Sequence, residues 1–440
     1  MDTRIRDIVE AMTFVDTHEH LVEESVRLAR TVSPILPAGD WANLISQYLP
    51  DDLLSAGMPQ DVLRTVLSPG CGASEKARLL EPWWARTRHT GYGLGLRLSL
   101  QALYGEDDLT QASASRIAEK YEEAMRPGFY RTTLCDVAQI EHCQVNSLER
   151  IFMSSQQPEL LRQDLSFVEL ARCSPEDVSL LERETGARAT CLDEWLGTID
   201  LMFDRHGHEA VAIKNQSAYA RSLDYLPVSK ARAARAFDEM KSAWGQYSPD
   251  SARALNDFCF RYCLMKAAEH NLPVKLHTGY YAGQAPMPLE RLRDNAPDVG
   301  RLLVDFPETT FVLMHAGYPY QDEPIALAKR YPNAIIDMCW TWIINPAAGI
   351  RFLREFLMAA PASKVLTFGG DHIMVENVVG HSMIARRGVA QVLAELVESG
   401  WIEFSEAADL AETLMRGNAT RIFTKQGQGR GELRDKYHVG

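Results

Sequence analysis

Several features that would place a chain of this size in a particular class are missing from the sequence. It has no dense block of lysine and arginine, and its formal net charge is −13, so a nucleic-acid-binding surface is not expected. No stretch supplies the ~18 uninterrupted apolar residues of a membrane span, and the initial MDTRIRDIVEAM lacks the apolar core of a signal peptide. The sequence therefore predicts a cytoplasmic protein that acts on a small molecule and contacts neither nucleic acid nor membrane.

Paired cysteines are missing as well. The eight cysteines include no Cys-x-x-Cys pair, and several of them lie inside apolar, periodic segments. Cys259 and Cys263 stand at i and i+4 of a helical pattern, which favours a position in the core over a zinc clip. Disulfides are not expected.

What is present is a regular succession of short apolar segments, each after the first separated from its predecessor by one or more helical patterns. They lie near residues 13–18, 138–145, 160–169, 209–214, 273–278, 309–315, 333–338 and 365–370. Strands that alternate with helices build parallel βαβ units, and eight such units predict a (β/α)8 TIM barrel. The alternative is an open doubly wound sheet, but the glycine-rich phosphate loop that such a sheet normally carries does not follow Leu21.

Residues 22 to about 112 interrupt this succession with helical pieces that are rich in aromatic residues. This content is too high for a disordered loop, so the segment is expected to fold as a helical cap inserted between the first and second strands. With 440 residues, 46% of them apolar, the chain can bury a large core. We expect one barrel domain over 1–440 that includes the cap.

Candidate metal ligands stand at the ends of the predicted strands. His18 and His20 lie two residues apart, so in an extended backbone both imidazoles project to the same face. Other strand ends carry Lys214, His277, His315 and Asp371. Because a barrel keeps its chemistry at the C-terminal ends of its strands, these six side chains are expected to meet and to bind a divalent metal.

The chemistry of such a site can be outlined from the residue types. His18, His20 and Asp371 would hold one ion and leave a position for water, whose pKa such a metal lowers to about 7. Asp371 is also placed to accept the proton of that water and to pass it to a leaving group. His277 and His315 would hold a second ion, or His277 would join the first ion while His315 polarises the scissile carbonyl. Zinc is the expected metal, with manganese or iron as alternatives.

The segments VDTHEH, AIK, KLHTG, LMHAGYP and FGGDH, and more weakly RGNATRIF, resemble those of the amidohydrolase superfamily of metal-dependent (β/α)8-barrel hydrolases. The turn after the sixth strand and the long insertion are similar to the branch that contains aromatic-acid decarboxylases and uronate isomerase. The resemblance implies that Lys214 reacts with carbon dioxide to give a carbamate that bridges two metal ions, which requires a neutral amine. If Lys214 stays cationic instead, it would bind a substrate carboxylate beside a single ion.

Four further residues follow the strand ends and are candidates for substrate binding. Tyr219 and Arg221 follow Lys214, and the planar guanidinium suits a carboxylate. Trp340 and Trp342 suggest an apolar substrate body, but they would serve equally well in packing against the cap. Arg221 has the alternative of pairing with a surface acid.

The sequence thus predicts an enzyme, a hydrolase that uses metal-activated water to cleave an amide, a related C–N bond or an ester in a small carboxylate-bearing molecule. The first alternative is a metal-dependent non-oxidative decarboxylase of an aromatic or related acid. A uronate isomerase and a non-catalytic binding barrel are more distant alternatives. The substrate's identity and assembly into a homo-oligomer stay open.

Overall fold

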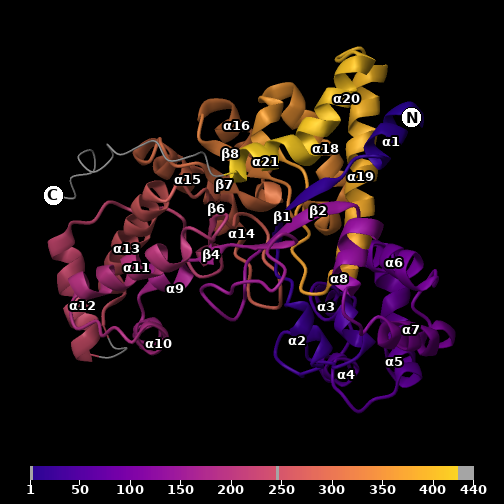
Figure 1. Ribbon diagram of the computed structural model, residues 1–440, viewed down its shortest axis with the longest axis horizontal. Coiled ribbons are helices and arrows are strands. Elements are labelled where there is room, and N and C mark those ends of the chain that lie inside the picture. Colours follow the sequence, from indigo (N-terminus) through magenta and orange to yellow (C-terminus); the bar gives the residue numbers. More distant parts are fainter. Residues whose placement is uncertain (1–2, 244–246, 425–440) are drawn as a thin grey trace.

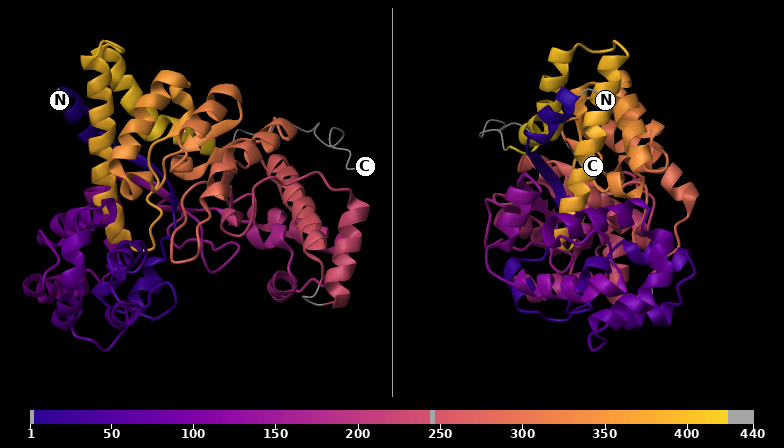
Figure 2. Two further views of the ribbon diagram at one scale, coloured as in Figure 1. Left: turned by 180° about the vertical axis from the view of Figure 1, so that it is seen from behind. Right: turned by 90° about the vertical axis from the view of Figure 1, so that its right-hand side faces the viewer.

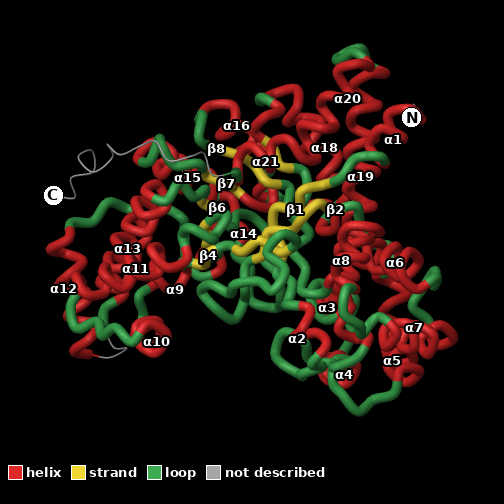
Figure 3. The backbone as a smooth tube through the Cα atoms, in the orientation of Figure 1, coloured by secondary structure: helices red, strands yellow, loops and turns green. Residues whose placement is uncertain are grey.

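Short strands occupy the centre of the molecule and helices surround them (Figures 1 and 3). The computed structural model describes residues 3–243 and 247–424. Within these ranges the strands are β1 (Phe14–Glu19), β2 (Ile140–Val145), β3 (Leu161–Gln163), β4 (Leu165–Ser166), β5 (Ile213–Asn215), β6 (Val274–Leu276), β7 (Phe311–Leu313), β8 (Ala334–Asp337) and β9 (Val365–Leu366). Every segment in which a strand was predicted contains one, and segment 160–169 contains two because the strand breaks at Asp164.

The strands form two parallel sheets, one in the order β1-β2-β3 and the other in the order β4-β5-β6-β7-β8-β9. Further backbone hydrogen bonds connect the sheets. Val211 N donates to Gln163 O at 2.9 Å, and Thr17 N donates to Phe368 O at 3.0 Å. The fold is therefore α/β with parallel sheets, as predicted.

One connection differs from the predicted alternation. Residues 146–160, between β2 and β3, contain no helix. The segment contains Asn146, Ser147, Ser154, Ser155 and Pro158, residue types that favour turns. Ile151 and Phe152 are buried, so this connection packs onto the molecule as an irregular loop.

Between β1 and β2 the chain is mostly helical. The helices of this region are α2 (Glu24–Leu28), α3 (Leu49–Ser55), α4 (Gln60–Val66), α5 (Ala73–Thr87), α6 (Gly91–Tyr104), α7 (Gln111–Glu123) and α8 (Phe129–Arg131), with a short 3-10 helix at Trp41–Ile45. In Figures 1 and 2 these helices lie on one side below the strands, whereas the helices between β4 and β6 lie on the other side.

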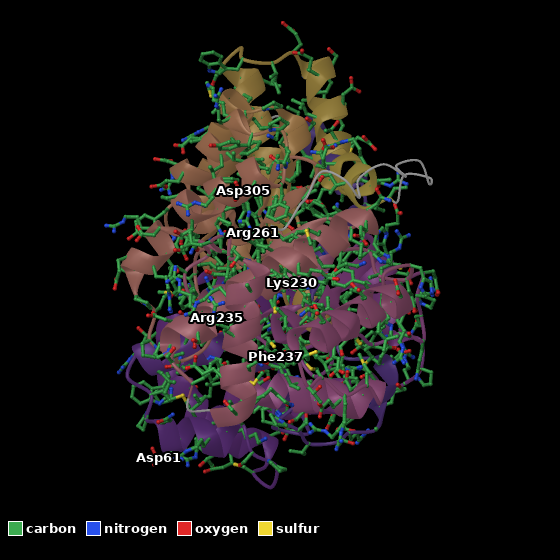
Figure 4. The ribbon with its side chains drawn as sticks, turned by 90° about the vertical axis from the view of Figure 1, so that its left-hand side faces the viewer. Asp61, Lys230, Arg235, Phe237, Arg261 and Asp305 are labelled. Atoms are coloured by element: carbon green, nitrogen blue, oxygen red, sulfur yellow. The ribbon has the colours of Figure 1, made fainter. Side chains whose placement is uncertain are left out.

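The remaining helices cover the outside of the strands. They are α1 (Thr3–Glu10), α9 (Val168–Arg172), α10 (Pro175–Thr185), α11 (Leu192–His206), α12 (Lys230–Ala243), α13 (Pro249–Glu269), α14 (Leu289–Arg293), α15 (Asn295–Asp305), α16 (Asp322–Arg330), α17 (Thr341–Ile344), α18 (Pro346–Ala359), α19 (Val375–Glu398), α20 (Phe404–Glu412) and α21 (Asn418–Phe423). Figure 4 shows α12, with Lys230 and Arg235, beside Arg261 and Asp305, whose side chains join α13 to α15 at 2.7 Å. Cys259 and Cys263 are buried in the core, as predicted. None of the helices in the described ranges combines the length and apolar character needed to cross a bilayer.

Helix α6 packs very closely on α19 at Gly380. A Cβ atom at position 380 would overlap the carbonyl oxygen of Gly95 and would lie 2.9 Å from Ser99 Oγ. Gly380→Ala is therefore expected to lower the free energy of unfolding by about 1–3 kcal/mol through overpacking. Urea unfolding measures the change. The matched control is Gly197→Ala in α11, where nothing lies within 4 Å of the added atom; equal or greater loss of stability in this control would contradict the packing explanation.

Strand β2 buries His142 away from the predicted ligands. Burial, aided by the positive charges of Arg162 and Lys275 and opposed by Glu141, lowers the pKa of His142 from 6.5 to about 4. Below pH 6.5 the unfolded chain takes up a proton at this residue that the folded protein does not. The free energy of unfolding should therefore fall as pH drops toward 4, by about 1.4 kcal/mol per pH unit from this residue.

His142→Gln should remove this contribution. Urea unfolding of both proteins at several pH values between about 7 and 4, with a chelator present, measures the difference. Stability curves of the wild type and the variant that run parallel over this range would show that His142 does not titrate as described.

Candidate metal centre

The structure brings all six predicted ligands together at the C-terminal ends of the strands. His18 lies in β1 and Lys214 in β5. His277 directly follows β6, and His315 lies in the 3-10 turn Met314–Gly317 that follows β7. Asp371 follows β9 and donates its backbone N–H to His18 O at 2.9 Å. Both His315 and Asp371 have positive φ, 62° and 64°. Such a backbone is uncommon for residues other than glycine and is a feature of functional turns.

The first group consists of His18, His20 and Asp371. The Nε2 atoms of both histidines lie 3.2 Å from Asp371 Oδ1, and they lie 3.3 Å from each other. Lys214 Nζ lies 3.3 Å from His18 Nε2, so the lysine adjoins this group. The three ligand atoms are all within 4.8 Å of one another, close enough to coordinate one ion.

The second group is the pair His277 and His315. His315 Nε2 lies 2.9 Å from His277 Nδ1. Cys339, which sequence reasoning did not select, offers its sulfur near His315 and Asp371. Burial raises the pKa of the Cys339 thiol well above its ordinary value, so the protonated thiol is a poor ligand as it stands.

Hydrogen bonds to backbone carbonyls fix the tautomers of three of these histidines. His20 Nδ1 lies 2.7 Å from Asn146 O, His315 Nδ1 lies 3.0 Å from Cys339 O, and His277 Nε2 lies 2.9 Å from Tyr280 O. A carbonyl only accepts, so each of these nitrogens carries the proton and the other ring nitrogen presents a lone pair.

The lone pairs of His277 and His315 therefore face each other at 2.9 Å. Two acceptor nitrogens this close repel each other unless a cation is near them. The same holds for the cluster of imidazole nitrogens and carboxylate oxygen around His18. The donor set thus fits a divalent metal, with neutral imidazoles as ligands.

The electrostatics of the site agree with neutral imidazoles. Burial, aided by the charge of Lys214, lowers the pKa of His18 to about 4, and burial lowers the pKa of His315 to about 3. Burial also lowers the pKa of Lys214 below its ordinary value, which favours a neutral amine. Burial raises the pKa of Asp371, but hydrogen bonds with His18 and His20 outweigh it and hold that pKa well below the ordinary value.

Two residues of the region between β1 and β2 hold the turn at Asp371. Gln47 Nε2 donates to the carbonyl oxygen of Asp371 at 2.7 Å, and the hydroxyl of Tyr48 donates to the same atom. The Gln47 side chain also accepts from Ile373 N at 2.8 Å. Sequence reasoning did not select either residue, because this region matched no motif.

A cavity of about 670 Å³ opens beside the metal ligands. His20, Lys214, His277 and Asp371 contribute to one part of its wall. Apolar residues form much of the rest of the wall. They come from the segment after α2, the loop after β2, helix α9 and the loop after β9, and they are Pro34, Ile35, Pro37, Leu148, Val168, Ala171 and Ile373. This volume suits a small organic molecule.

Tyr219 and Arg221, both predicted to bind substrate, line this cavity. The Tyr219 ring lies 4.5 Å from that of His277, and its hydroxyl accepts from Ala282 N at 3.1 Å. Arg221 donates to Asp257 at 2.6 Å and to Asn256, so its charge is already paired. Arg172, which the sequence did not indicate, lines the cavity too, and its Nε and Nη2 donate to Asp177.

Trp340 and Trp342 do not line this cavity and are fully buried. Trp340 stacks on Tyr48 at 4.7 Å, and it therefore packs against the region between β1 and β2. Trp342 donates its indole N–H to Thr367 O at 2.7 Å and packs against Gly349 and Gly388. The structure thus places both indoles in packing positions.

The family model described as amidohydrolase matches residues 215–425. This segment is therefore similar to the amidohydrolase family. It contains His277, His315 and Asp371, and it begins directly after Lys214. The superfamily resemblance of the sequence motifs is thereby confirmed.

A curated relative and two solved structures are similar to this chain. Protein fluG of Emericella nidulans is 26% identical over 223 residues, a match that spans 48% of this chain and 25% of the relative's length. Uronate isomerase of Thermotoga maritima has a TM-score of 0.76 at 16% identity and covers 96% of both chains. Glucuronate isomerase of Caulobacter crescentus has a TM-score of 0.74 at 17% identity, covering 96% of this chain and 93% of its own. At these identities the two structures share the fold with this chain.

Proposed function

We propose that this chain is a metal-dependent hydrolase that cleaves an amide, a related C–N bond or an ester in a small carboxylate-bearing molecule. The observation that carries the proposal is the convergence of imidazole lone pairs and the Asp371 carboxylate beside a cavity. We propose further that the two parallel sheets form one closed (β/α)8 barrel. Backbone hydrogen bonds from β1 to residues 368–372, and from Val211 to Gln163, support closure.

When bound at this site, a divalent metal supplies Lewis acidity and lowers the pKa of water to about 7. His18, His20 and Asp371 would hold one ion, and His277 and His315 would hold a second. Zinc is the first candidate because imidazole and carboxylate ligands suit it.

Asp371 moves the proton in this proposal. Its carboxylate adjoins His18 and His20, so it lies within hydrogen-bond reach of a water beside them. It takes a proton from the attacking water at a carboxylate oxygen and delivers it to the leaving nitrogen or oxygen. Gln47 and Tyr48 orient Asp371 through its carbonyl oxygen, which leaves the carboxylate free to face the ligands.

Lys214 is the proposed bridge between the two groups of ligands. Its amine adjoins His18 and is buried, and its pKa is lowered by that burial. A neutral amine can add to carbon dioxide, forming a C–N bond and releasing a proton, and the carbamate oxygens would then face both groups of histidines. In the alternative, Lys214 remains an ammonium and binds the substrate carboxylate beside one ion.

A second candidate, isomerisation of a uronate, is favoured by the likeness to two sugar-acid isomerases over nearly the whole chain. The apolar part of the cavity wall, formed by residues such as Pro34, Ile35 and Val168, suits an apolar or aromatic substrate body and supports the hydrolase. Polar side chains of the same wall, among them Gln47 and Glu169, could bind hydroxyl groups, so the products distinguish the two candidates. Arg172 and Arg221 also line the cavity, but each is already paired with a carboxylate of this chain, Asp177 and Asp257 respectively.

Product analysis in ¹⁸O-labelled water tests the proposal. The zinc-supplemented protein is incubated with N-acyl and aryl-amide derivatives of small carboxylic acids and with hexuronates. A hydrolase incorporates one water oxygen into the acid that it releases. Conversion of a hexuronate without change of mass would instead establish the isomerase, and release of carbon dioxide would establish a decarboxylase.

A further inference from the structure

The outer ring nitrogen of His18 differs from those of the other histidines in the site. The outer nitrogens of His20, His277 and His315 each have a backbone carbonyl as acceptor, at 2.7 to 3.0 Å. His18 Nδ1 is buried and has no hydrogen-bond partner. The group that faces it is the carboxylate of Asp164, whose Oδ2 lies 3.9 Å away.

Asp164 is itself held by a buried lysine. Lys275 Nζ donates to Asp164 Oδ1 at 2.9 Å and to Asp164 Oδ2 at 2.7 Å, and it also donates to Thr17 O at 2.8 Å. The side chains of Asp164 and Lys275 are fully buried. Lys275 lies in β6, two residues before His277, which directly follows the strand.

The ion pair also lies next to the apolar interior. Lys275 Nζ is 5.0 Å from the centre of the Phe423 ring, which belongs to a buried cluster with Val15 and Ala212. A carboxylate in such surroundings is costly unless a cation and hydrogen bonds compensate it. Lys275 supplies both, and because it binds both oxygens it also fixes the direction in which Oδ2 faces His18.

We propose that Asp164, fixed by Lys275, is the positioning residue for His18, an inference that rests on the proposed metal site. With Nε2 committed to a metal, His18 must carry its proton on Nδ1, and Asp164 is the acceptor. The separation of 3.9 Å would have to shorten to about 3.2 Å or less for this hydrogen bond to form when the metal is bound. The carboxylate then orients the ring and raises its basicity as a ligand, as such partners do for metal-bound histidines.

The test replaces the ion pair by apolar residues of similar size, in Asp164→Leu/Lys275→Met. Removing both charges avoids an unpaired buried group, so the fold should be retained. Zinc affinity of the full chain is measured by competition with a chromophoric chelator, and the fold by circular dichroism and thermal unfolding. We expect zinc affinity to fall about 10- to 100-fold. The control is Glu376→Gln, which alters another buried ion pair, with Arg27, and should leave zinc affinity unchanged.

Each outcome bears on the proposal. Zinc affinity within about twofold of the wild type in the folded double variant would overturn the role of Asp164 and leave the proposed function intact. Failure of the wild type to bind zinc would overturn the proposed function and this inference with it. If the double variant does not fold, a crystal structure of the zinc-loaded wild type decides. An Nδ1 to Oδ2 distance below about 3.2 Å supports the role, and any other acceptor for Nδ1 refutes it.

Discussion

Asp371→Asn is expected to abolish turnover while the metal stays largely bound. The amide cannot accept the proton of the attacking water, so kcat should fall by about 10²–10⁴-fold, the usual contribution of a general base. His18 and His20 remain to hold the ion. Asparagine also tolerates the positive φ of 64° at this position, so the turn after β9 should be preserved.

Steady-state kinetics together with elemental analysis measure both parts of this prediction. The control variant is Asp305→Asn, which removes a carboxylate paired with Arg261 on the outer helices and should leave kcat unchanged. A near-normal rate in Asp371→Asn would rule out Asp371 as the base. If Asp371→Asn loses the metal as well as its activity, the result would assign Asp371 the role of a metal ligand and not that of the base.

Lys214→Ala should lower the metal content from about two ions per chain to about one. It should also lower kcat by about 10²–10⁴-fold, the same range as expected for Asp371→Asn. The reason is that the variant lacks the amine that forms the bridging carbamate. A short carboxylic acid added to the variant can occupy the vacated space and should restore part of the second ion.

The control for this prediction is Lys364→Met. Burial lowers the pKa of Lys364 to about 8, but its ammonium bonds to the carbonyls of Ala328 and Tyr331, outside the site. Metal content should be unaffected. In the wild type, a high-resolution map should show density beyond Lys214 Nζ. A bare ammonium beside a single ion would contradict the carbamate and favour the carboxylate-binding alternative.

The positions of the strands could be predicted because short apolar segments alternate with amphipathic helices, and the structure places a strand in each of them. The convergence of the six side chains could be inferred for a related reason. Parallel strands direct their C-terminal ends to one edge, so residues as distant as His18 and Asp371 become neighbours. The positions of these residues at the ends of predicted parallel strands are therefore enough to predict that their side chains meet.

Other features of the site leave no mark in the sequence. The acceptors for His20, His277 and His315 are backbone carbonyls, which any residue can supply. The pairing of Arg221 with Asp257 depends on how α13 packs. Gln47 and Tyr48 reach Asp371 from a region that matches no motif, and Trp340 is buried against the same region. Trp342 is buried against Gly349 and Gly388 instead.

The break between β3 and β4 is a similar case. Apolar periodicity through residues 160–169 predicts one strand, whereas Asp164 interrupts it and turns its carboxylate toward Lys275. The charge of Asp164 inside an apolar segment is the sequence signal that could have indicated the break in the strand. Its partner is 111 residues away, so only the fold identifies the pair.

Metal content most directly tests the central claim, that these six side chains form a divalent-metal site. The protein is purified without chelator, supplemented with zinc and desalted, and the metal is quantified per chain by elemental analysis. We expect about two ions per chain, and well under half of that in a His18→Asn/His20→Asn variant that remains folded. A metal content near zero in the supplemented wild type, or equal contents in both proteins, would contradict the account.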